Sequence, residues 1–181
     1  MPQRDIPEMG RQVFTVPNAL SLLRLAMVPV VVVLLFAKAD VAAVIIFILA
    51  AVTDFLDGVL ARRTQPTFVG KILDPVADRL MLSSTAVVLA VRGTLPVWAV
   101  AILVARDVFG LVGGLAFGRK LSVNRVGKAA TALLMVAIAL TIFSPGAVGE
   151  VVFYAGFGLS LVAALMYVVN ISRLSGGGGA T

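Results

Sequence analysis

Six long apolar stretches constrain the fold of this chain more than any other feature of its sequence. A helix needs about 20 apolar residues to cross the hydrocarbon core of a bilayer. Six runs approach that length, and because an open strand edge in lipid leaves backbone groups unsatisfied, we predict helices despite the many valines. The predicted spans are residues 19–37, 41–61, 72–91, 95–118, 126–144 and 148–171. We therefore expect an all-α, polytopic membrane protein with six transmembrane helices.

The composition agrees with this fold and excludes several kinds of chemistry. The 181 residues, 60% hydrophobic and 13% charged, suit one membrane domain. The chain has no Cys and no His, which excludes disulfides, thiolate catalysis, the usual zinc sites and imidazole acid–base chemistry. The net charge of +6 favours anionic headgroups and phosphorylated ligands over nucleic acid. We expect a polar juxtamembrane segment at 1–13, a six-helix domain at 14–174 and a flexible Gly-rich tail at 175–181.

Basic residues gather at alternate ends of the predicted spans. One side has only Lys38 and Arg92. The other side has Arg4, Arg11, Arg62, Arg63, Lys71, Arg79, Arg119, Lys120, Arg125, Lys128 and Arg173. Because cytoplasmic loops carry the excess of Lys and Arg, the rich side and both termini are predicted to be cytoplasmic.

Four aspartates mark the cytoplasmic ends of the second and third predicted spans. Asp54 and Asp57 are three residues apart, and Asp74 and Asp78 are four apart, so each pair shares a helix face. The short link predicts antiparallel neighbouring helices whose acids face each other. Carboxylates this close need compensating cations, and a bare Asp in hydrocarbon costs several kcal/mol. Oxygen ligands favour Mg²⁺ or Mn²⁺, and two such ions would clamp a diphosphate.

Small and basic residues follow the first acid pair. Gly58 and Ala61 leave a groove beside the helix where a flat base or a phosphate could approach, and Arg62 could bind phosphate in bidentate fashion. Helix packing is the alternative role for Gly58 and Ala61, and a topology signal is the alternative for Arg62 and Arg63. A capping role suits a lone Asp near a helix end but does not explain four facing acids.

The stretch from Asp54 to Asp78 resembles the signature of the CDP-alcohol phosphatidyltransferase family. That signature reads Asp-x-x-Asp-Gly-x-x-Ala-Arg, a spacer, then Gly-x-x-x-Asp-x-x-x-Asp, and every named position matches. The spacer, residues 63–69, is one residue shorter than is usual in the family. The resemblance also includes the six-span layout, Pro17-Asn18 and Arg24, and so covers most of the chain.

The resemblance implies an activity and a set of site residues. It implies metal-dependent transfer of a phosphatidyl group from CDP-diacylglycerol to an alcohol, with release of CMP, by a membrane-embedded homodimer. Asp54, Asp57 and Asp74 would be ligands of Mg²⁺ or Mn²⁺, as two ions, and Asp78 would also lie at the metals and act as general base. The absence of His likewise leaves a carboxylate for that role. The implied CDP site comprises Asp57, Gly58, Ala61, Arg62, Gly70 and Asp74.

The identity of the acceptor is inferred from the fourth predicted span and the loop after it. Residues 95–128 resemble the glycerol-lipid branch, which includes phosphatidylglycerophosphate synthases and CMP-forming cardiolipin synthases. The former typically have Arg-Glu and a further Arg two turns later, where this chain has Arg106-Asp107 and Gly114. This difference favours phosphatidylglycerol as the acceptor, with glycines 110, 113 and 114 making room for acyl chains. The candidate acceptor-binding residues are Arg106, Arg119, Lys120, Arg125 and Lys128.

Several alternatives stay open at this point. Glycerol 3-phosphate is the second candidate acceptor and an inositol phosphate the third, while Arg106-Asp107 could be a self-neutralised structural pair. A cation-coupled transporter also uses buried carboxylates, but such sites tend to lie near the midplane in repeated halves, and no repeat is visible here. A non-catalytic scaffold does not explain the acids. We expect an enzyme of a bacterial cytoplasmic membrane with its active site facing the cytoplasm.

Overall fold

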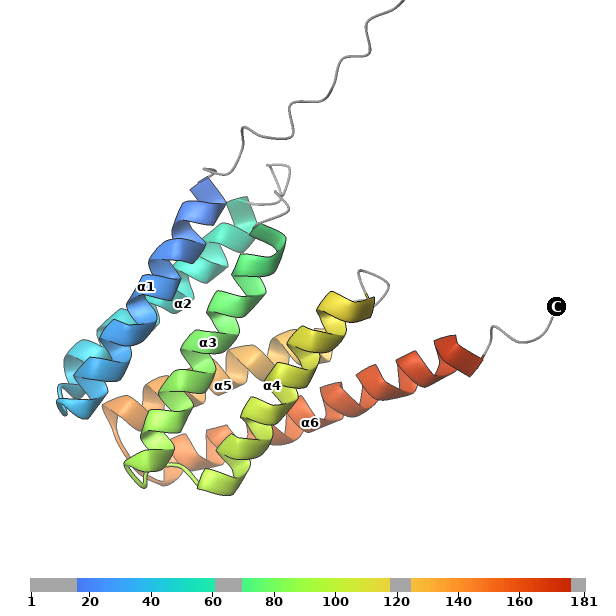
Figure 1. The fold of residues 1–181 in the computed structure, drawn as a ribbon. Coiled ribbons are helices and arrows are strands. Elements are labelled where there is room, and N and C mark those ends of the chain that lie inside the picture. The colour runs from blue at the N-terminus through green and yellow to red at the C-terminus, as the bar shows by residue number, and fades with distance from the viewer. Residues whose placement is uncertain (1–15, 61–69, 118–124, 177–181) are drawn as a thin grey trace, which may run out of the picture.

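The structure, a computed structural model, contains six α-helices in the residues that it describes, 16–60, 70–117 and 125–176. They are α1 Val16–Phe36, α2 Asp40–Leu60, α3 Gly70–Val91, α4 Val97–Phe117, α5 Arg125–Phe143 and α6 Ala147–Gly176 (Figure 1). The prediction of an all-α fold is confirmed for these residues, with one helix for each predicted span. Helix α6 continues through Gly176, past the predicted span and into the first residues of the predicted tail.

Three of these helices are long and apolar enough to cross a membrane. They contain the segments Ala19–Phe36, Val126–Phe143 and Ala147–Met166. The apolar part of α2 is shorter, Asp40–Thr53. Helix α3 has charged residues throughout its first three turns, which lowers its hydropathy. The described residues therefore define a helical membrane protein.

The helices run alternately up and down and pack as two connected groups (Figure 1). Helix α1 packs against both α2 and α3, and α5 and α6 form an antiparallel hairpin. Helix α4 lies against α3, and α5 also contacts α2 and α3. The antiparallel course predicted for α2 and α3 is present, but both helices pack more extensively on α1 than on each other within the described residues.

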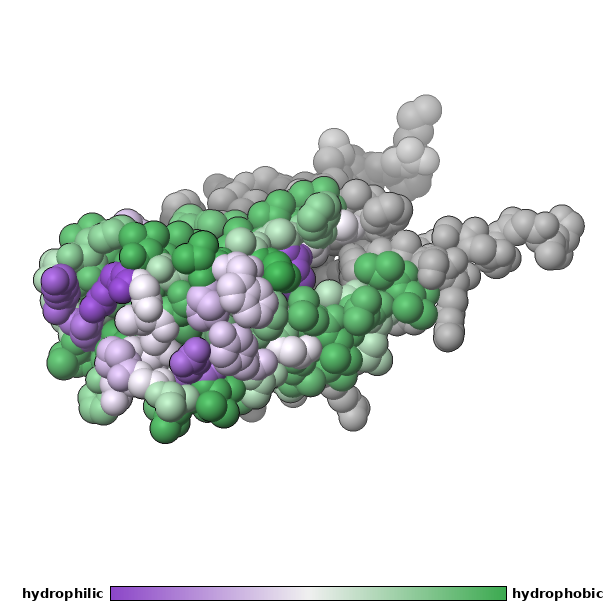
Figure 2. Space-filling model, turned by 90° about the horizontal axis from the view of Figure 1, so that it is seen from below, coloured by the Kyte–Doolittle hydropathy of each residue, from purple (hydrophilic) through white to green (hydrophobic). Residues whose placement is uncertain are grey.

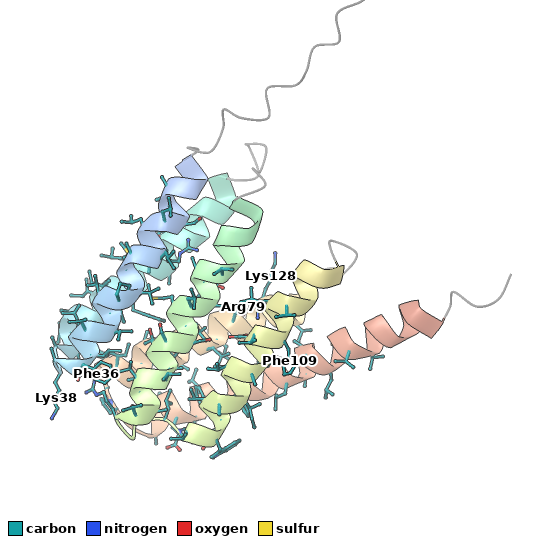
Figure 3. The ribbon with its side chains drawn as sticks, viewed as in Figure 1. Phe36, Lys38, Arg79, Phe109 and Lys128 are labelled. Carbon is teal, nitrogen blue, oxygen red and sulfur yellow. The ribbon has the colours of Figure 1, made fainter. Side chains whose placement is uncertain are left out.

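The core of the bundle is apolar, and so is much of its outer surface. Core side chains such as Leu35, Phe47, Leu89 and Leu134 are buried. Other large apolar residues point outward, and Phe109 on α4 is 77% exposed (Figure 3). Figure 2 shows the end of the bundle opposite the N-terminus, where small hydrophilic patches interrupt a largely hydrophobic face. A helix that is hydrophobic on most sides suits a protein surrounded by lipid.

Glycines on α6 allow it to approach α5 closely. A Cβ atom at Gly156 would lie 3.1 Å from the backbone nitrogen of Leu134. At Gly149 it would lie 2.7 Å from Thr141 Oγ1 and 3.1 Å from the Thr141 backbone nitrogen. Small residues at such positions are typical of packed membrane helices, since they bring two backbones into van der Waals contact.

Two tight turns close the ends of α1 and α3. Lys38, with φ of 58°, and Gly93, with φ of 76°, are in the left-handed conformation that commonly ends helices. The backbone N–H of Ala39 donates to Leu34 O at 2.9 Å, and that of Thr94 donates to Leu89 O at 3.0 Å. These bonds satisfy carbonyl groups that the helix ends would otherwise leave open.

An ion pair joins the two turns. Arg92 donates from Nη1 and Nη2 to the two carboxylate oxygens of Asp40, at 2.5 and 2.9 Å. The hydrogen bond from Arg92 holds the pKa of Asp40 below its ordinary value of 3.8, and Asp40 raises the pKa of Arg92. The pair lies between the predicted spans and ties the start of α2 to the end of α3.

We expect Asp40→Asn to lower the free energy of unfolding at neutral pH by up to about 1 kcal/mol, the range for a partly exposed bidentate pair. Because the folded-state pKa of Asp40 is depressed, its stabilisation is present above the unfolded-state pKa and is lost as pH falls through the folded-state value. The difference between parent and variant should therefore shrink below about pH 3.8. Thermal unfolding in detergent across this range measures it, and a difference that persists at low pH would contradict the assignment.

Candidate functional site

The four aspartates lie on helices at the same end of the bundle (Figure 1). Asp54 and Asp57 are in the last two turns of α2, and Asp74 and Asp78 are in the first three turns of α3. The backbone thus has the helical spacing on which the sequence argument depends. The side chains of Asp54, Asp57 and Asp74 are outside the described residues. Asp78 is described, and its side chain is half-buried with Oδ1 fully buried.

The other predicted CDP-site residues are described only in part. Gly58 is in the last turn of α2, and Gly70 begins α3. Ala61 and Arg62 fall in 61–69, outside the described residues. The nucleotide site therefore stays a prediction from the sequence. The structure describes only the backbone of the two helix ends that would form it.

The chemistry of the acidic residues fits a hard divalent cation. Within the described side chains no three potential ligands gather at one point, since only one of the four aspartates is included. Asp78 nevertheless presents a buried carboxylate oxygen, and a buried anion needs a cation or strong donors nearby. Carboxylates without His or Cys are the ligand set that Mg²⁺ and Mn²⁺ prefer.

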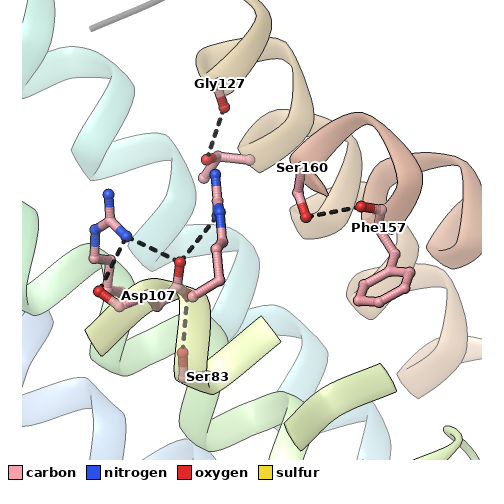
Figure 4. A network of polar contacts seen from close by, with 8 residues as sticks. Ser83, Asp107, Gly127, Phe157 and Ser160 are labelled. Atoms are coloured by element: carbon pink, nitrogen blue, oxygen red, sulfur yellow. Dashed lines mark hydrogen bonds and ion pairs between the residues drawn. The ribbon is translucent and has the colours of Figure 1, made fainter. Parts of the chain in front are cut away.

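Beside Asp78, a polar network joins α3 to α4 (Figure 4). Asp107, which is 5% exposed, accepts hydrogen bonds at Oδ1 from Arg79 Nη1 and from Arg106 Nη1, both at 2.9 Å. Ser83 Oγ donates to the other oxygen, Oδ2, at 3.2 Å, and Arg79 Nη1 also donates to the Asp107 carbonyl oxygen at 3.3 Å. Arg106 and Asp107 are thus an ion pair, as predicted, but the carboxylate also binds a second arginine from another helix.

This network borders a small polar cavity that also includes the proposed base. The cavity has a volume of about 40 Å³ and opens between α3, α4 and α5. Its lining residues are Asp78, Arg79, Leu82, Arg106, Asp107, Thr131 and Leu134. A space of this size holds a few water-sized groups, such as hydroxyl or phosphate oxygens. The cavity therefore brings charged donors next to Asp78.

The predicted acceptor-binding residues divide into three groups. Arg106 lines the cavity. Lys128, on the first turn of α5, is exposed one turn before Thr131 and lies toward the same end as Arg79, away from Lys38 (Figure 3). The side chains of Arg119, Lys120 and Arg125 are outside the described residues. Arg79 was predicted from the sequence only as a topology signal. Its spacing of four residues from Ser83, directly after Asp78, places Arg79 and Ser83 on the same helix face.

Gly110 makes room for the network. A Cβ atom there would lie 3.0 Å from Arg79 Nη1. The sequence predicts that this glycine makes room for acyl chains. In the structure its open side instead receives a guanidinium group, because Arg79 reaches across from α3 to Asp107, three residues earlier on α4.

A buried arginine on α1 adds positive charge at this end of the bundle. Arg24 is 2% exposed and follows the buried Ser21 by three residues. It lies about two turns into α1, which packs against both helices that carry the aspartates. Charged groups are almost never fully buried unless they are paired. The positive charge of Arg24 therefore lies close to the helices that carry the aspartates and partly offsets their negative charge.

An apolar groove runs between α2 and α5 below the acidic end of α2. Its volume is about 300 Å³. It is lined by Phe47, Ile48, Ala51, Val52, Met135, Val136 and Ala139. Val52 is two residues from Asp54, so the groove ends close to the first aspartate of the motif. Its lining suits a hydrocarbon chain.

The described residues define a helical membrane protein with a charged site at one end. There the aspartate-bearing ends of α2 and α3 adjoin a cavity lined by two arginines and two aspartates. The particular family follows from comparison with known proteins. The sequence profile of CDP-alcohol phosphatidyltransferase matches residues 14–168, so the chain belongs to the CDP-alcohol phosphatidyltransferase family and is a transferase.

Named relatives cover most of the chain. It is 40% identical to a cardiolipin synthase (CMP-forming) of Streptomyces coelicolor, over 90% of this chain and 85% of the relative. It is 34% identical to a CDP-diacylglycerol–glycerol-3-phosphate 3-phosphatidyltransferase of Salmonella choleraesuis, over 84% of this chain and 88% of the relative. A Bacillus subtilis protein of that second name is 32% identical, over 69% of this chain and 75% of the relative.

Proposed function

We propose that this enzyme transfers the phosphatidyl group of CDP-diacylglycerol to a hydroxyl group of a glycerol-containing acceptor and releases CMP. The observation that carries the proposal is the aspartate motif on α2 and α3, whose last member, Asp78, lines a cavity with two arginines. The names of the relatives agree, because each describes phospholipid synthesis of this kind.

The donor would bind at the end of α2 and the start of α3. Asp54, Asp57, Asp74 and Asp78 would hold two divalent ions, Mg²⁺ or Mn²⁺, which when bound neutralise the diphosphate. The proposed nucleotide-binding set is Asp57, Gly58, Ala61, Arg62, Gly70 and Asp74. The apolar groove between α2 and α5 would receive an acyl chain, since its lining is hydrocarbon and it ends near Asp54.

Asp78 would act as the general base. Its carboxylate accepts the proton of the acceptor hydroxyl while that oxygen attacks the phosphorus bonded to the diacylglycerol. A new P–O bond forms, the P–O bond to CMP breaks, and CMP leaves with the electron pair. The position of Asp78 supports this role, because the cavity beside it has room for an acceptor oxygen.

Phosphatidylglycerol is the acceptor that we propose, which makes cardiolipin the lipid product. The basic residues of the cavity, Arg79 and Arg106, share one buried carboxylate, and Gly114 contributes no charge where a phosphate-binding arginine would lie. A phosphodiester needs less positive charge than a phosphomonoester. The second candidate is glycerol 3-phosphate, favoured by Lys128 and by two of the relatives. An inositol phosphate is the third.

The membrane arrangement is part of the same proposal. All six helices would span the bacterial cytoplasmic membrane as one domain over 14–174, with both termini and the active site on the cytoplasmic side. The enzyme would work as a homodimer. A cation-coupled transporter, the alternative from another class, would release no CMP.

The acceptor assay tests the function directly. Purified enzyme with CDP-diacylglycerol and phosphatidylglycerol should yield cardiolipin and CMP, at a rate well above that of phosphatidylglycerophosphate formation from glycerol 3-phosphate. Mass spectrometry of the lipid products and measurement of CMP distinguish the outcomes. Formation of phosphatidylglycerophosphate without cardiolipin would overturn the acceptor but not the transferase. Absence of CMP with every acceptor would overturn the proposed function.

A further inference from the structure

The buried carboxylate of Asp107 binds two arginines beside Asp78, the proposed base. Asp107 Oδ1 accepts a hydrogen bond from Nη1 of Arg79 and of Arg106, each at 2.9 Å, and the Asp107 side chain is only 8% exposed. The second carboxylate oxygen accepts from Ser83 Oγ at 3.2 Å. The two guanidinium groups come from different helices, α3 and α4 (Figure 4). Asp107 thus holds two positive charges close together at a single atom.

Both arginines keep hydrogen-bond donors that Asp107 does not use. A guanidinium group has five N–H donors, and among the contacts of the described residues each arginine reaches Asp107 through Nη1 alone. The side chains are 31% and 19% exposed, so neither is sealed in the core. Both line the cavity that contains Asp78. The remaining N–H groups suit the oxygens of a phosphate group, to which arginine binds in a fork.

The charge of this group of residues is low for a phosphate site. Two arginines and Asp107 leave a single net positive charge, and Asp78 adds a negative charge to the same cavity. A phosphodiester has one negative charge, whereas a phosphomonoester has close to two at neutral pH. This low positive charge therefore suits a diester better than it suits a monoester. Lys128 is exposed at the start of α5 and adds charge outside this group.

On the basis of the proposed phosphatidyl transfer, we propose that Asp107 is a specificity-determining residue of the acceptor site. It cancels one of the two arginine charges and so shifts the preference of the enzyme from phosphomonoester toward phosphodiester acceptors. Asp107 does not touch the reacting atoms. It acts through Arg79 and Arg106, which contact the acceptor phosphate.

Four proteins test the proposal, because the net charge of Arg79, Arg106 and Asp107 is known in each of them. The charge is +1 in the parent, with two arginines and one aspartate; it becomes +2 in Asp107→Asn, 0 in Arg106→Gln and +1 again in the double variant. We expect the ratio of kcat/KM for glycerol 3-phosphate to that for phosphatidylglycerol to follow this order. The ratio should rise about tenfold in Asp107→Asn, the effect of one charge-assisted contact, and fall in Arg106→Gln. The double variant should return close to the parent ratio.

Two further variants separate charge from structure. Asp107→Glu keeps the charge, and Ser83→Ala removes only the hydrogen bond to Oδ2, so both should keep the ratio within about twofold of the parent, even where the rate or the stability falls. A ratio that does not follow the charge order, in a parent that forms CMP, would overturn the role of Asp107 alone. If Asp107→Asn does not fold, the double variant compared with Arg106→Gln still isolates the charge of Asp107, and the double variant should have the higher ratio. A parent that forms no CMP from CDP-diacylglycerol would instead overturn the proposed function.

Discussion

Asp78→Asn is expected to lower kcat by at least about a hundredfold, within the range that a general base contributes. Asparagine has nearly the same shape, so the cavity and the neighbouring Arg79 should keep their places, but the amide cannot accept the proton of the acceptor hydroxyl. The KM for CDP-diacylglycerol should change much less than kcat, because Asp54, Asp57 and Asp74 would still hold the metal ions at the donor while the acceptor hydroxyl loses its base. Steady-state release of CMP at saturating acceptor, together with donor titration, measures both quantities.

A matched control is available at the far end of the molecule. Glu150 is an exposed acid in the first turn of α6. Glu150→Gln makes the same change from acid to amide and should leave kcat within about twofold of the parent, as is usual for surface substitutions. Near-normal turnover by Asp78→Asn would show that another group accepts the proton. A variant that loses donor binding and turnover together would show that Asp78 acts mainly as a metal ligand and not as the base.

The bounds of the helices in this protein are predicted closely by the bounds of its apolar runs. Predicted and observed ends agree within three residues at every helix end except that of α6, which extends from the predicted 171 to Gly176. Residues Ser172, Arg173 and Ser175 end the apolar run, but backbone hydrogen bonds do not depend on side-chain hydropathy. Hydropathy therefore identifies the part of a helix that lipid surrounds, while the helix itself can continue beyond it.

The polar site is predictable where its residues are neighbours in sequence and not where they come together from separate helices. Asp54 and Asp57 share a helix face by spacing alone, and Arg106 and Asp107 are adjacent. Arg79 is 28 residues from Asp107, and only the packing of α3 on α4 brings them into contact. Their opposite charges on successive helices were the available signal, but spacing could not give the register between two helices.

The contact between α3 and α4, which the sequence does not predict, changes the interpretation of Gly110. In the sequence a glycine-rich stretch on a membrane helix suggests space for lipid. In the structure the space at Gly110 is filled by Arg79, whose Nη1 would be 3.0 Å from an added Cβ atom. Small residues near an ion pair thus accommodate charged side chains as well as neighbouring helices. The pairing of α3 and α4 through Asp107 is what gives this glycine its role.

The second large effect is expected from the other three aspartates. Asp54→Asn, Asp57→Asn and Asp74→Asn should each reduce turnover to about 1% or less, because stabilisation of charge at the reacting centre is worth a hundredfold or more. Each change removes a negatively charged ligand from an oxygen-only site, which weakens the binding of a hard divalent ion. CMP release measures the activity, and Mn²⁺ titration followed by calorimetry measures the loss of metal affinity independently of turnover.

Removal of the metal from the parent enzyme should have the same consequence. Excess chelator is expected to abolish CMP release, and added Mg²⁺ or Mn²⁺ should restore it in the parent but not in the three variants at the same concentration. Glu150→Gln, with its altered acid far from the motif, should respond to chelator and metal as the parent does. The reason lies in the positions of the acids: they occupy helix ends in a membrane protein without His or Cys, where uncompensated carboxylates are costly. Full activity in excess chelator would therefore contradict the metal site itself, and unchanged Mn²⁺ affinity in an inactive variant would remove that aspartate from the ligand set.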